Sequence, residues 1–234
     1  MRFVNFLLIG GILLSAEYAR AQDGHVLARH RMVKDQIEAR GISDARILAA
    51  MSKIERHRFI PFLYQGFAYA DSPVPIDHGQ TISQPFIVAL MTDLLDVRPG
   101  DVVLEVGTGS GYQAAVLAEL GAEVYSIEIV PELGRGAGRR LAELGYDDAH
   151  TRVGDGYYGW PGPGPFDGIM VTAAASHIPP PLIQQLKPGG RMVIPVGGAF
   201  FNQELMLVAK DEAGRITTRQ LLPVRFVPLT REQA

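Results

Sequence analysis

The sequence predicts an α/β fold: a doubly wound, mostly parallel sheet that ends in an antiparallel hairpin. From residue 102 onward, short apolar runs of strand character alternate with segments of helical character. Such alternation requires parallel strands joined by right-handed crossovers. A glycine-rich turn directly follows the first of these strands, and ligands bind at this edge of open α/β sheets.

The individual elements follow from periodicity and from turn residues. Strands are predicted at 102–106, 123–128, 150–153, 167–172 and 191–196, then a hairpin at 204–210 and 216–227 with its turn at 211–214. Helices are predicted over 111–120 and from Pro131 onward, since proline suits a first helical turn. Three glycines should each weaken this second helix by about 1 kcal/mol relative to alanine, namely Gly134, Gly136 and Gly138.

The residues before this alternation predict helices and a long irregular loop. A helix over 26–40 should end at Gly41, and Ser43 should cap a second helix. The stretch 61–85, rich in proline, glycine and aromatic residues, is too long for a simple connection and is predicted to be functional. The apolar positions expected on these helices are Leu27, Met32, Ile37, Ile47, Leu48 and Met51.

Composition narrows the possible functions. The 234 residues suit one α/β domain, and the formal charge of −3 with a pI near 6.1 argues against a strongly basic nucleic-acid surface. There is no cysteine, which excludes disulfides, thiolate metal sites and cysteine nucleophiles. The six histidines lack a recognisable ligand spacing, so we expect no metal site.

The first residues have the character of a secretory signal. Arg2 precedes the uncharged apolar run 3–16, and Ala19-Arg20-Ala21 offers a small-x-small cleavage pattern. We therefore expect residues 1–21 to be a cleaved signal peptide, with an uncleaved anchor or a misassigned start as the alternatives. Removal of these residues changes the formal charge from −3 to −4.

The glycine turn and the acids that follow it predict a nucleoside site. Residues 107–111 read Gly-Thr-Gly-Ser-Gly, so the third glycine comes one position earlier than in the dinucleotide fingerprint. Glu128 ends the second strand, where a carboxylate can accept the hydroxyls of a ribose. Asp155-Gly156 follows the third strand and is either a further ligand contact or a plain turn. The glycine spacing resembles the first motif of class I S-adenosylmethionine-dependent methyltransferases and disfavours an NAD-dependent oxidoreductase.

Several segments, in order, resemble the bacterial protein-L-isoaspartate (D-aspartate) O-methyltransferases. The most particular are Gly79-Gln80-Thr81-Ile82-Ser83-Gln84-Pro85 and Val224-Arg225-Phe226-Val227-Pro228-Leu229. The resemblance extends from about residue 32 to residue 230. It implies N-terminal helices and a substrate loop in residues 22–95, and a methyltransferase domain in residues 96–234. The two regions are expected to pack as one compact unit. Asp77 and His78 depart from the family pattern, and we expect Asp77 to face solvent.

By this resemblance, the methyl donor S-adenosyl-L-methionine binds without a metal, and Ser83 takes the active-site position. Ser83 could also be the N-cap of a helix that starts at Pro85. Substrate binding is implied for Thr81, Ser83, Arg225 and Val227. Cofactor binding is implied for Gln80, Thr81, Ile82, Ser83, Glu105, Gly107, Thr108, Gly109, Gly111, Tyr112, Glu128, Asp155, Gly156, Thr172 and Thr230.

The implied reaction methylates the free carboxylate of isoaspartyl and D-aspartyl residues in damaged proteins. We expect a monomer, no nucleic-acid partner, and no stable membrane association if the signal is cleaved. A real signal would place the enzyme outside the cytoplasm, for instance in the periplasm, whereas the family is mostly cytoplasmic. A tRNA methyltransferase of the same fold is the alternative. The acidic balance and the sequence Thr172-Ala173-Ala174-Ala175 after the fourth strand disfavour it, because amino-group methylators carry an Asp/Asn-Pro-Pro-aromatic motif there.

Overall fold

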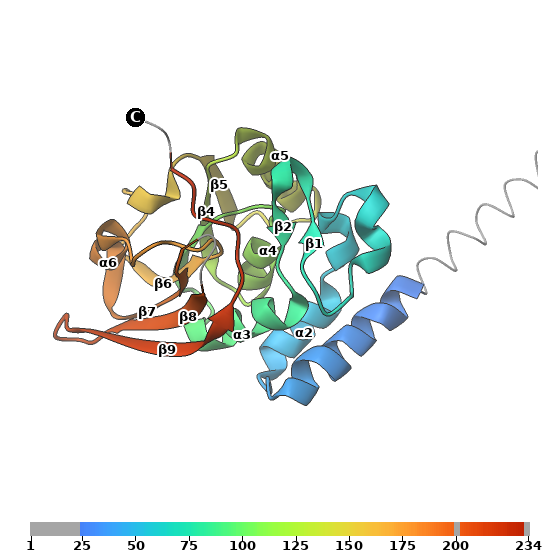
Figure 1. Ribbon diagram of the computed structural model, residues 1–234, viewed down its shortest axis with the longest axis horizontal. Helices are drawn as coiled ribbons and strands as arrows, with labels where there is room; N and C mark the ends of the chain where they lie inside the picture. Colours follow the sequence, from blue (N-terminus) through green and yellow to red (C-terminus); the bar gives the residue numbers. More distant parts are fainter. Residues whose placement is uncertain (1–23, 199–201, 232–234) are drawn as a thin grey trace, which may run out of the picture.

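A computed structural model describes residues 24–198 and 202–231, so the predicted signal at 1–21 lies outside the described residues. The main sheet has seven strands in the order β5-β4-β3-β6-β7-β8-β9 (Figure 1). The strands β3 to β7 are parallel and β8 and β9 are antiparallel, which confirms the predicted fold. Their bounds are β3 Val102–Val106, β4 Glu123–Glu128, β5 Ala149–Val153, β6 Phe166–Val171, β7 Leu186–Val196, β8 Gln203–Lys210 and β9 Ile216–Val224.

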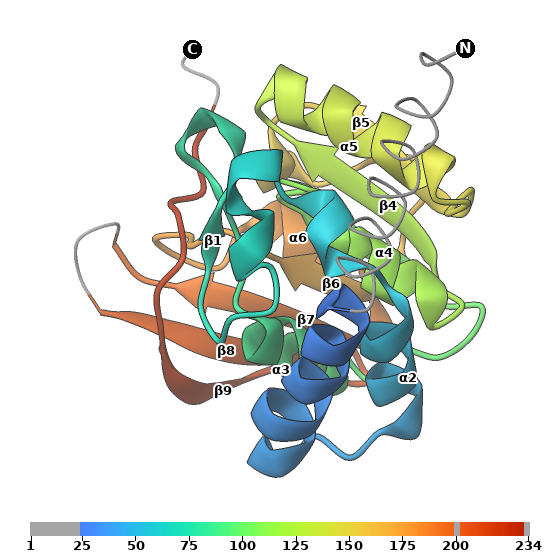
Figure 2. The same ribbon diagram turned by 90° about the vertical axis from the view of Figure 1, so that its right-hand side faces the viewer.

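Helices cover both faces of the sheet because successive strand residues point in opposite directions. Val103 and Met170 belong to the core beneath α3 (Pro85–Leu95), α4 (Tyr112–Glu119) and α5 (Pro131–Glu143). Leu104 and Ile169, their neighbours in the chain, belong to the second core, which packs against α6 (Pro180–Gln185). Figure 2 shows α4 and α5 together with the N-terminal helices on the first side of the sheet.

The N-terminal helices complete the first core. Residues 24–40 are helical, with a π-helical stretch η1 (Met32–Ile37) and a 3-10 turn η2 (Glu38–Arg40), and end at Gly41 with φ 97° as predicted. The next helix, α2 (Ala45–Lys53), is capped by Asp44, whose carboxylate accepts a hydrogen bond from the Arg46 amide. The expected cap at Ser43 was therefore wrong by one position. Met32, Ile37, Ile47 and Met51 are buried, whereas Leu27 is 53% exposed.

The stretch 61–85 is ordered but mostly irregular. After η3 (Arg56–Phe59) it contains the 3-10 turns η4 (Phe62–Phe67) and η5 (Asp77–Gly79) and a two-stranded hairpin of β1 (Val74–Pro75) and β2 (Thr81–Ile82). Ile76 in this hairpin reaches the glycine loop, since its Cδ1 would lie 3.6 Å from a Cβ added at Gly109. The hairpin therefore brings the predicted functional loop onto the carboxyl edge of the sheet.

Close packing explains two of the three glycines in α5. A Cβ at Gly138 would lie 2.5 Å from Thr151 Oγ1, and a Cβ at Gly134 would lie 3.1 Å from Val153 Cγ2. Gly136 faces open space. The helix thus lies close against β5 at two positions, where the absence of a side chain offsets the low helical propensity of glycine.

The two outer strands of the sheet, β5 and β9, carry charged and polar side chains among their apolar ones. β5 carries His150 and Arg152, and β9 carries Arg219 and Pro223. β9 ends at Val224, three residues earlier than predicted, because the backbone of Phe226 pairs with the side chain of Gln203 instead of a strand.

No helix in the described part of the chain is long and apolar enough to cross a membrane.

Candidate active site

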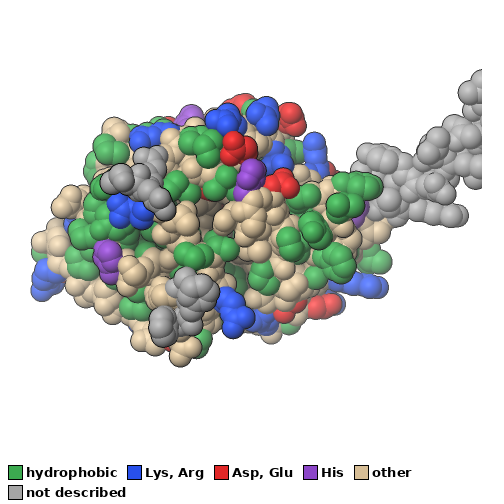
Figure 3. All heavy atoms as spheres, turned by 45° about the horizontal axis from the view of Figure 1, so that its top comes forward, with side chains coloured by type: hydrophobic (Ala, Val, Ile, Leu, Met, Phe, Trp, Pro, Cys, Tyr) green, Lys and Arg blue, Asp and Glu red, His purple; other side chains and the backbone are tan. Residues whose placement is uncertain are grey.

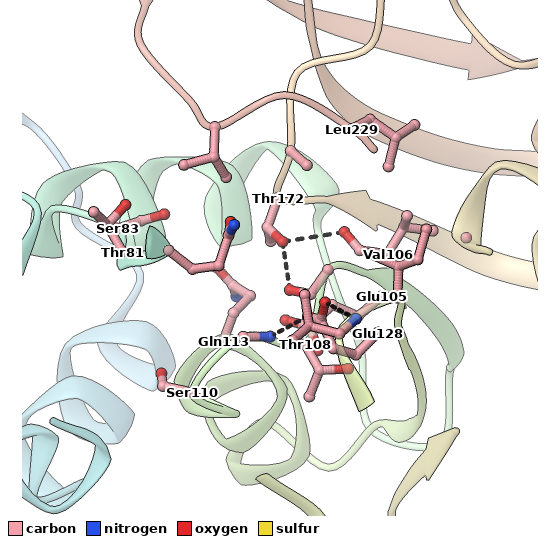
Figure 4. Close-up of a pocket in the computed structure, with 18 of the residues that line it drawn as sticks. Thr81, Ser83, Glu105, Val106, Thr108, Ser110, Gln113, Glu128, Thr172 and Leu229 are labelled. Carbon is pink, nitrogen blue, oxygen red and sulfur yellow. Dashed lines mark hydrogen bonds between the residues drawn. The ribbon is translucent and has the colours of Figure 1, made fainter. Parts of the chain in front are cut away.

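A narrow cavity lies at the carboxyl ends of β3, β4 and β6, beneath the β1–β2 hairpin and the segment that follows β9 (Figure 4). Parallel strands direct their carboxyl ends to one edge, so residues distant in the sequence meet there. Most of the predicted cofactor residues line this cavity: Gln80, Thr81, Ile82, Ser83, Glu105, Gly107, Thr108, Gly109, Tyr112, Glu128, Gly156, Thr172 and Thr230.

The glycine loop adopts a conformation that side chains disfavour. Gly107, Gly109 and Gly111 all have positive φ, at 100°, 52° and 87°. A Cβ at Gly107 would collide with Oγ1 of Thr172, whose hydroxyl lies 2.6 Å from the Gly107 carbonyl oxygen. Gly111 supports the loop from beneath, against Ala137 and Leu141, and is not among the residues that line the cavity.

Glu128 holds the loop and also faces the cavity. Its carboxylate accepts hydrogen bonds from the backbone amides of Gly109 (2.8 Å) and Val130 (3.0 Å). The side chain is buried, so it is not an exposed strand-end charge. Each carboxylate oxygen retains a free lone pair, which leaves the group able to accept hydroxyl hydrogens from a sugar.

Glu105 is the most unusual acid of the site. It is fully buried at the end of β3, it hydrogen-bonds to the Ser126 hydroxyl, and its Oε1 has no partner among the described residues. Burial raises the pKa of Glu105 to about 8, and the nearby Glu128 charge acts in the same direction. A cationic ligand in the cavity would therefore favour the ionised form of Glu105.

Ser83 lies where the hairpin meets the cavity, but it does not cap α3. The N-cap residue is Gln84, whose side chain makes no capping hydrogen bond to the helix. The side-chain amide of Gln84 donates instead to the carboxylate of Asp71. Ser83 is held through its carbonyl oxygen, which accepts a hydrogen bond from Arg56 Nη2 at 2.7 Å. The predicted capping role was wrong because a buried side chain, and not the helix start, fixes this residue.

Arg56 is a functional candidate that the sequence reasoning missed. Its guanidinium is completely buried and also donates to the Ala68 carbonyl oxygen at 2.7 Å. Its carbon Cζ lies 4.8 Å from the centroid of the Tyr112 ring, at the start of α4. Burial lowers the pKa of Arg56 to about 10, so it remains charged at neutral pH. The sequence offers no clear signal for it, since Arg56 lies in a run of charged and polar residues together with Arg58.

An open groove adjoins the cavity on the side of β9. Thr81, Ser83, Thr172 and Val227 line both spaces, whereas Arg225 lines the groove alone. The groove has a volume of about 1020 Å³, enough for an extended peptide segment. Gln203 shapes its floor by bonding both backbone groups of Phe226. Three of the four residues predicted to bind substrate, Thr81, Ser83 and Val227, thus lie where the two spaces meet, and the fourth, Arg225, lies in the groove.

Asp155 is placed differently from the other predicted cofactor residues. Its carboxylate accepts hydrogen bonds from the Tyr157 amide, at the start of η6 (Gly156–Tyr158), and from Arg231 near the end of the chain. Gly156 lines the cavity, but Asp155 is not among its lining residues.

Asp77, which departs from the family pattern, is exposed to solvent, as expected.

The sheet order, the glycine loop and the buried acid at the end of β4 define a class I S-adenosylmethionine-dependent methyltransferase. Residues 28–234 match the family model described as "Protein-L-isoaspartate(D-aspartate) O-methyltransferase (PCMT)". The chain belongs to this family, which confirms the predicted resemblance. The family and its solved relatives do not favour the NAD-dependent alternative.

Curated relatives and solved structures agree with this placement. A Nitrosospira multiformis protein-L-isoaspartate O-methyltransferase is 61% identical over 86% of this chain and 86% of its own length. A relative from Syntrophobacter fumaroxidans is 58% identical over 90% of this chain and 89% of its own. A solved protein-L-isoaspartate O-methyltransferase superposes with a TM-score of 0.78 at 30% identity, covering 86% of this chain and 65% of that longer one.

A solved structure from Plasmodium falciparum contains the demethylated form of the methyl donor. It is described as a beta-aspartate methyltransferase (PCMT) in complex with S-adenosyl-L-homocysteine. Its TM-score is 0.75 at 27% identity, and the superposition covers 87% of this chain and 99% of that one. The described residues of the present chain contain no cluster of metal-binding side chains.

Proposed function

We propose that the chain transfers the methyl group of S-adenosyl-L-methionine to the free carboxylate of L-isoaspartyl and D-aspartyl residues in damaged proteins. The observation that carries this proposal is the meeting of a nucleoside-type cavity and a peptide-sized groove at Thr81, Ser83 and Thr172. A small-molecule methyltransferase would not need the second space. Membership of the isoaspartyl methyltransferase family supports the same acceptor.

The residues of the cavity fit the proposed donor. Glu128 faces the cavity with free lone pairs for ribose hydroxyls, and Gly156 lines the same cavity. Glu105 places an unpartnered buried carboxyl group among the lining residues, where a positive charge would be favoured. The bound cofactor would supply a methyl group activated by the positive charge of its sulfur.

The protein's own task is to desolvate and orient. The substrate carboxylate, with an ordinary pKa of about 3.5, is already ionised at neutral pH, so no general base is required. Ser83 and Thr81 lie where the carboxylate would enter from the groove, and Arg225 and Val227 lie along the groove for the peptide. Alignment in a site that excludes water can supply most of the rate. The ester product then closes to a succinimide without further help from the enzyme.

The partners follow from the same features. Damaged polypeptides are the proposed occupants of the groove, and a monomer remains the expected oligomeric state. Nucleic acid is disfavoured because basic and acidic side chains are interspersed on the face that Figure 3 shows. Export is proposed only if residues 1–21 act as a signal; otherwise the cytoplasm is the expected compartment.

Two peptides that differ only in one linkage test the acceptor. The full-length protein is incubated with methyl-labelled S-adenosylmethionine and either an isoaspartyl peptide or its normal aspartyl counterpart. Base-labile label on the isoaspartyl peptide alone is the expected result. Equal labelling of both peptides, or labelling of neither by a protein that binds the donor, would contradict the proposal. Labelling of added tRNA would redirect it to a nucleic-acid acceptor.

A further inference from the structure

The segment that follows β9 crosses the carboxyl edge of the sheet. Figure 1 shows it running from the end of β9 toward the loop after β5. It is attached first beyond β6, where Ala174 accepts a hydrogen bond from the Leu229 amide and donates one to the Val227 carbonyl oxygen, both at 2.8 Å. These backbone bonds hold residues 227–229 as a short parallel bridge.

A second attachment lies at the far side of the cavity. Arg231 Nε donates to Asp155 Oδ2 at 2.8 Å, and the Asp155 side chain is only 7% exposed. The guanidinium carbon also lies 3.7 Å from the centroid of the Tyr157 ring and 4.9 Å from that of Tyr158. Asp155 follows β5 and Ala174 follows β6, so β3 and β4 lie between the attachments. Neighbouring strands are about 4.8 Å apart, and the segment therefore spans about 14 Å.

The cavity lies beneath this span. Pro228 and Leu229, which belong to the first attachment, and Thr230, which lies between the two, are among the residues that line it. Its volume is about 80 Å³, whereas sites for small molecules and cofactors usually have about 300–1,000 Å³. A nucleoside cofactor needs more room than this, so a part of the cavity wall moves when the ligand enters or leaves. The segment is suited to that movement because its far end is held by the Arg231 side chain.

We infer that Arg231 is a positioning residue: together with Asp155 and Tyr157 it fastens residues 227–230 over the cofactor and limits the rate of cofactor exchange. The inference rests on the proposed cofactor site. Arg231 is the attachment that opens, because its own side chain is 40% exposed to solvent and its cation–π contact adds only modestly. The backbone bonds at Ala174 are sheltered and act as the hinge. Asp155 therefore serves the cofactor through Arg231.

Cofactor release measures this role directly. Full-length protein is loaded with methyl-labelled S-adenosylmethionine, chased with excess unlabelled cofactor, and sampled by rapid filtration. We expect R231Q to release the label about tenfold faster than the wild type, equivalent to about 1.4 kcal/mol. R215Q is the matched control, since Arg215 forms a similar exposed ion pair with Asp211 at 2.6 Å in the distant β8–β9 turn. Its release rate should equal that of the wild type.

A double-mutant cycle separates the clasp from a general loosening of the site. D155N should also accelerate release, and the double variant R231Q/D155N should be no faster than the faster single variant, because both remove one contact. Equal release rates for R231Q, R215Q and the wild type would overturn the inference, as would accelerations that multiply in the double variant. The measurement involves no acceptor, so an incorrect acceptor would not affect it. A wild-type protein that captures no label would contradict the proposed cofactor site instead.

Discussion

Replacing Arg56 with methionine removes the buried guanidinium that holds the active-site loop. Two carbonyl oxygens, those of Ala68 and Ser83, would lose their donors at 2.7 Å. Each unsatisfied buried acceptor costs about 1–3 kcal/mol. Removing a buried charge whose hydrogen bonds go only to neutral carbonyls recovers roughly 1–4 kcal/mol. The two effects largely offset each other, and we expect a net loss of about 2 kcal/mol in the free energy of unfolding.

Activity should fall much further than stability. Ser83 would no longer be held from behind, and a displacement of about 1 Å at a reacting centre can cost roughly 10²-fold in rate. Arg56→Lys should lie between the two, since a single ammonium group cannot reproduce the planar fork. The free energy of unfolding is measured by urea denaturation, and kcat/KM with the isoaspartyl peptide.

Arg58→Met provides the control for this prediction. Arg58 lies two residues further on, with its side chain 47% exposed and a loose ion pair to Glu55 at 3.7 Å. Its replacement should change stability by less than about 0.5 kcal/mol and leave activity intact. The reasoning would be refuted if Arg56→Met methylated the peptide like the wild type. A loss of more than about 5 kcal/mol would show that relief of the buried charge had been overestimated.

Three further predictions concern protonation and packing. Burial raises the pKa of Glu105 to about 8, so its negative charge develops as the pH increases through this value. The affinity for the cationic methyl donor should therefore increase from pH 6.5 to 8.5 and level off above. Calorimetric titrations should show a smaller increase for Glu105→Gln. Burial, with the stacked His25 ring 4.1 Å away, lowers the pKa of His57 to about 4. An unfolded histidine titrates near 6.5, so the stability that neutral His57 contributes is complete above that pH and falls by about 2 kcal/mol as the pH decreases toward 4. In denaturation series, the difference in the free energy of unfolding between the wild type and His57→Gln should follow this pH dependence and should not change above pH 7. In α5, Gly136→Ala should raise the free energy of unfolding by up to about 1 kcal/mol, and with it the thermal midpoint. Gly138→Ala should lower the thermal midpoint, because its Cβ would lie 2.5 Å from Thr151 Oγ1. Equal effects of the two substitutions would show that α5 shifts freely on the sheet.

The sequence predicted those features that depend on local periodicity and on residues close in the chain. The strands β3 and β4 match their predicted bounds because their apolar runs are flanked by turn and helix-start residues: glycines at 100, 107 and 121, and Pro131 after β4. The glycine loop and Glu128 were found for the same reason, since the loop directly follows β3 and Glu128 is the last residue of β4. Asp44 instead of Ser43 as a cap shows the usual uncertainty of one residue at a helix end.

Residues whose roles depend on distant partners could not be predicted in this way. Arg56 and Ser83 are 27 positions apart, and Arg231 and Asp155 are 76 apart, so neither contact has a local signature. Similarly, Gly138 is explained only by its contact with Thr151 on the neighbouring strand. Tertiary packing decides these positions, and a single sequence does not contain it in readable form.

The charged residues and the proline on the outer strands have a consequence for an enzyme whose proposed clients are damaged polypeptides. Partly unfolded chains add readily to an exposed, flat and apolar strand, which can start amyloid-like growth. β5 presents His150 and Arg152 at one edge, and β9 presents Arg219 and Pro223 at the other. Charge and proline at these positions discourage a client from extending the sheet. The protein can thus hold an aged chain in its groove without becoming a template for its aggregation.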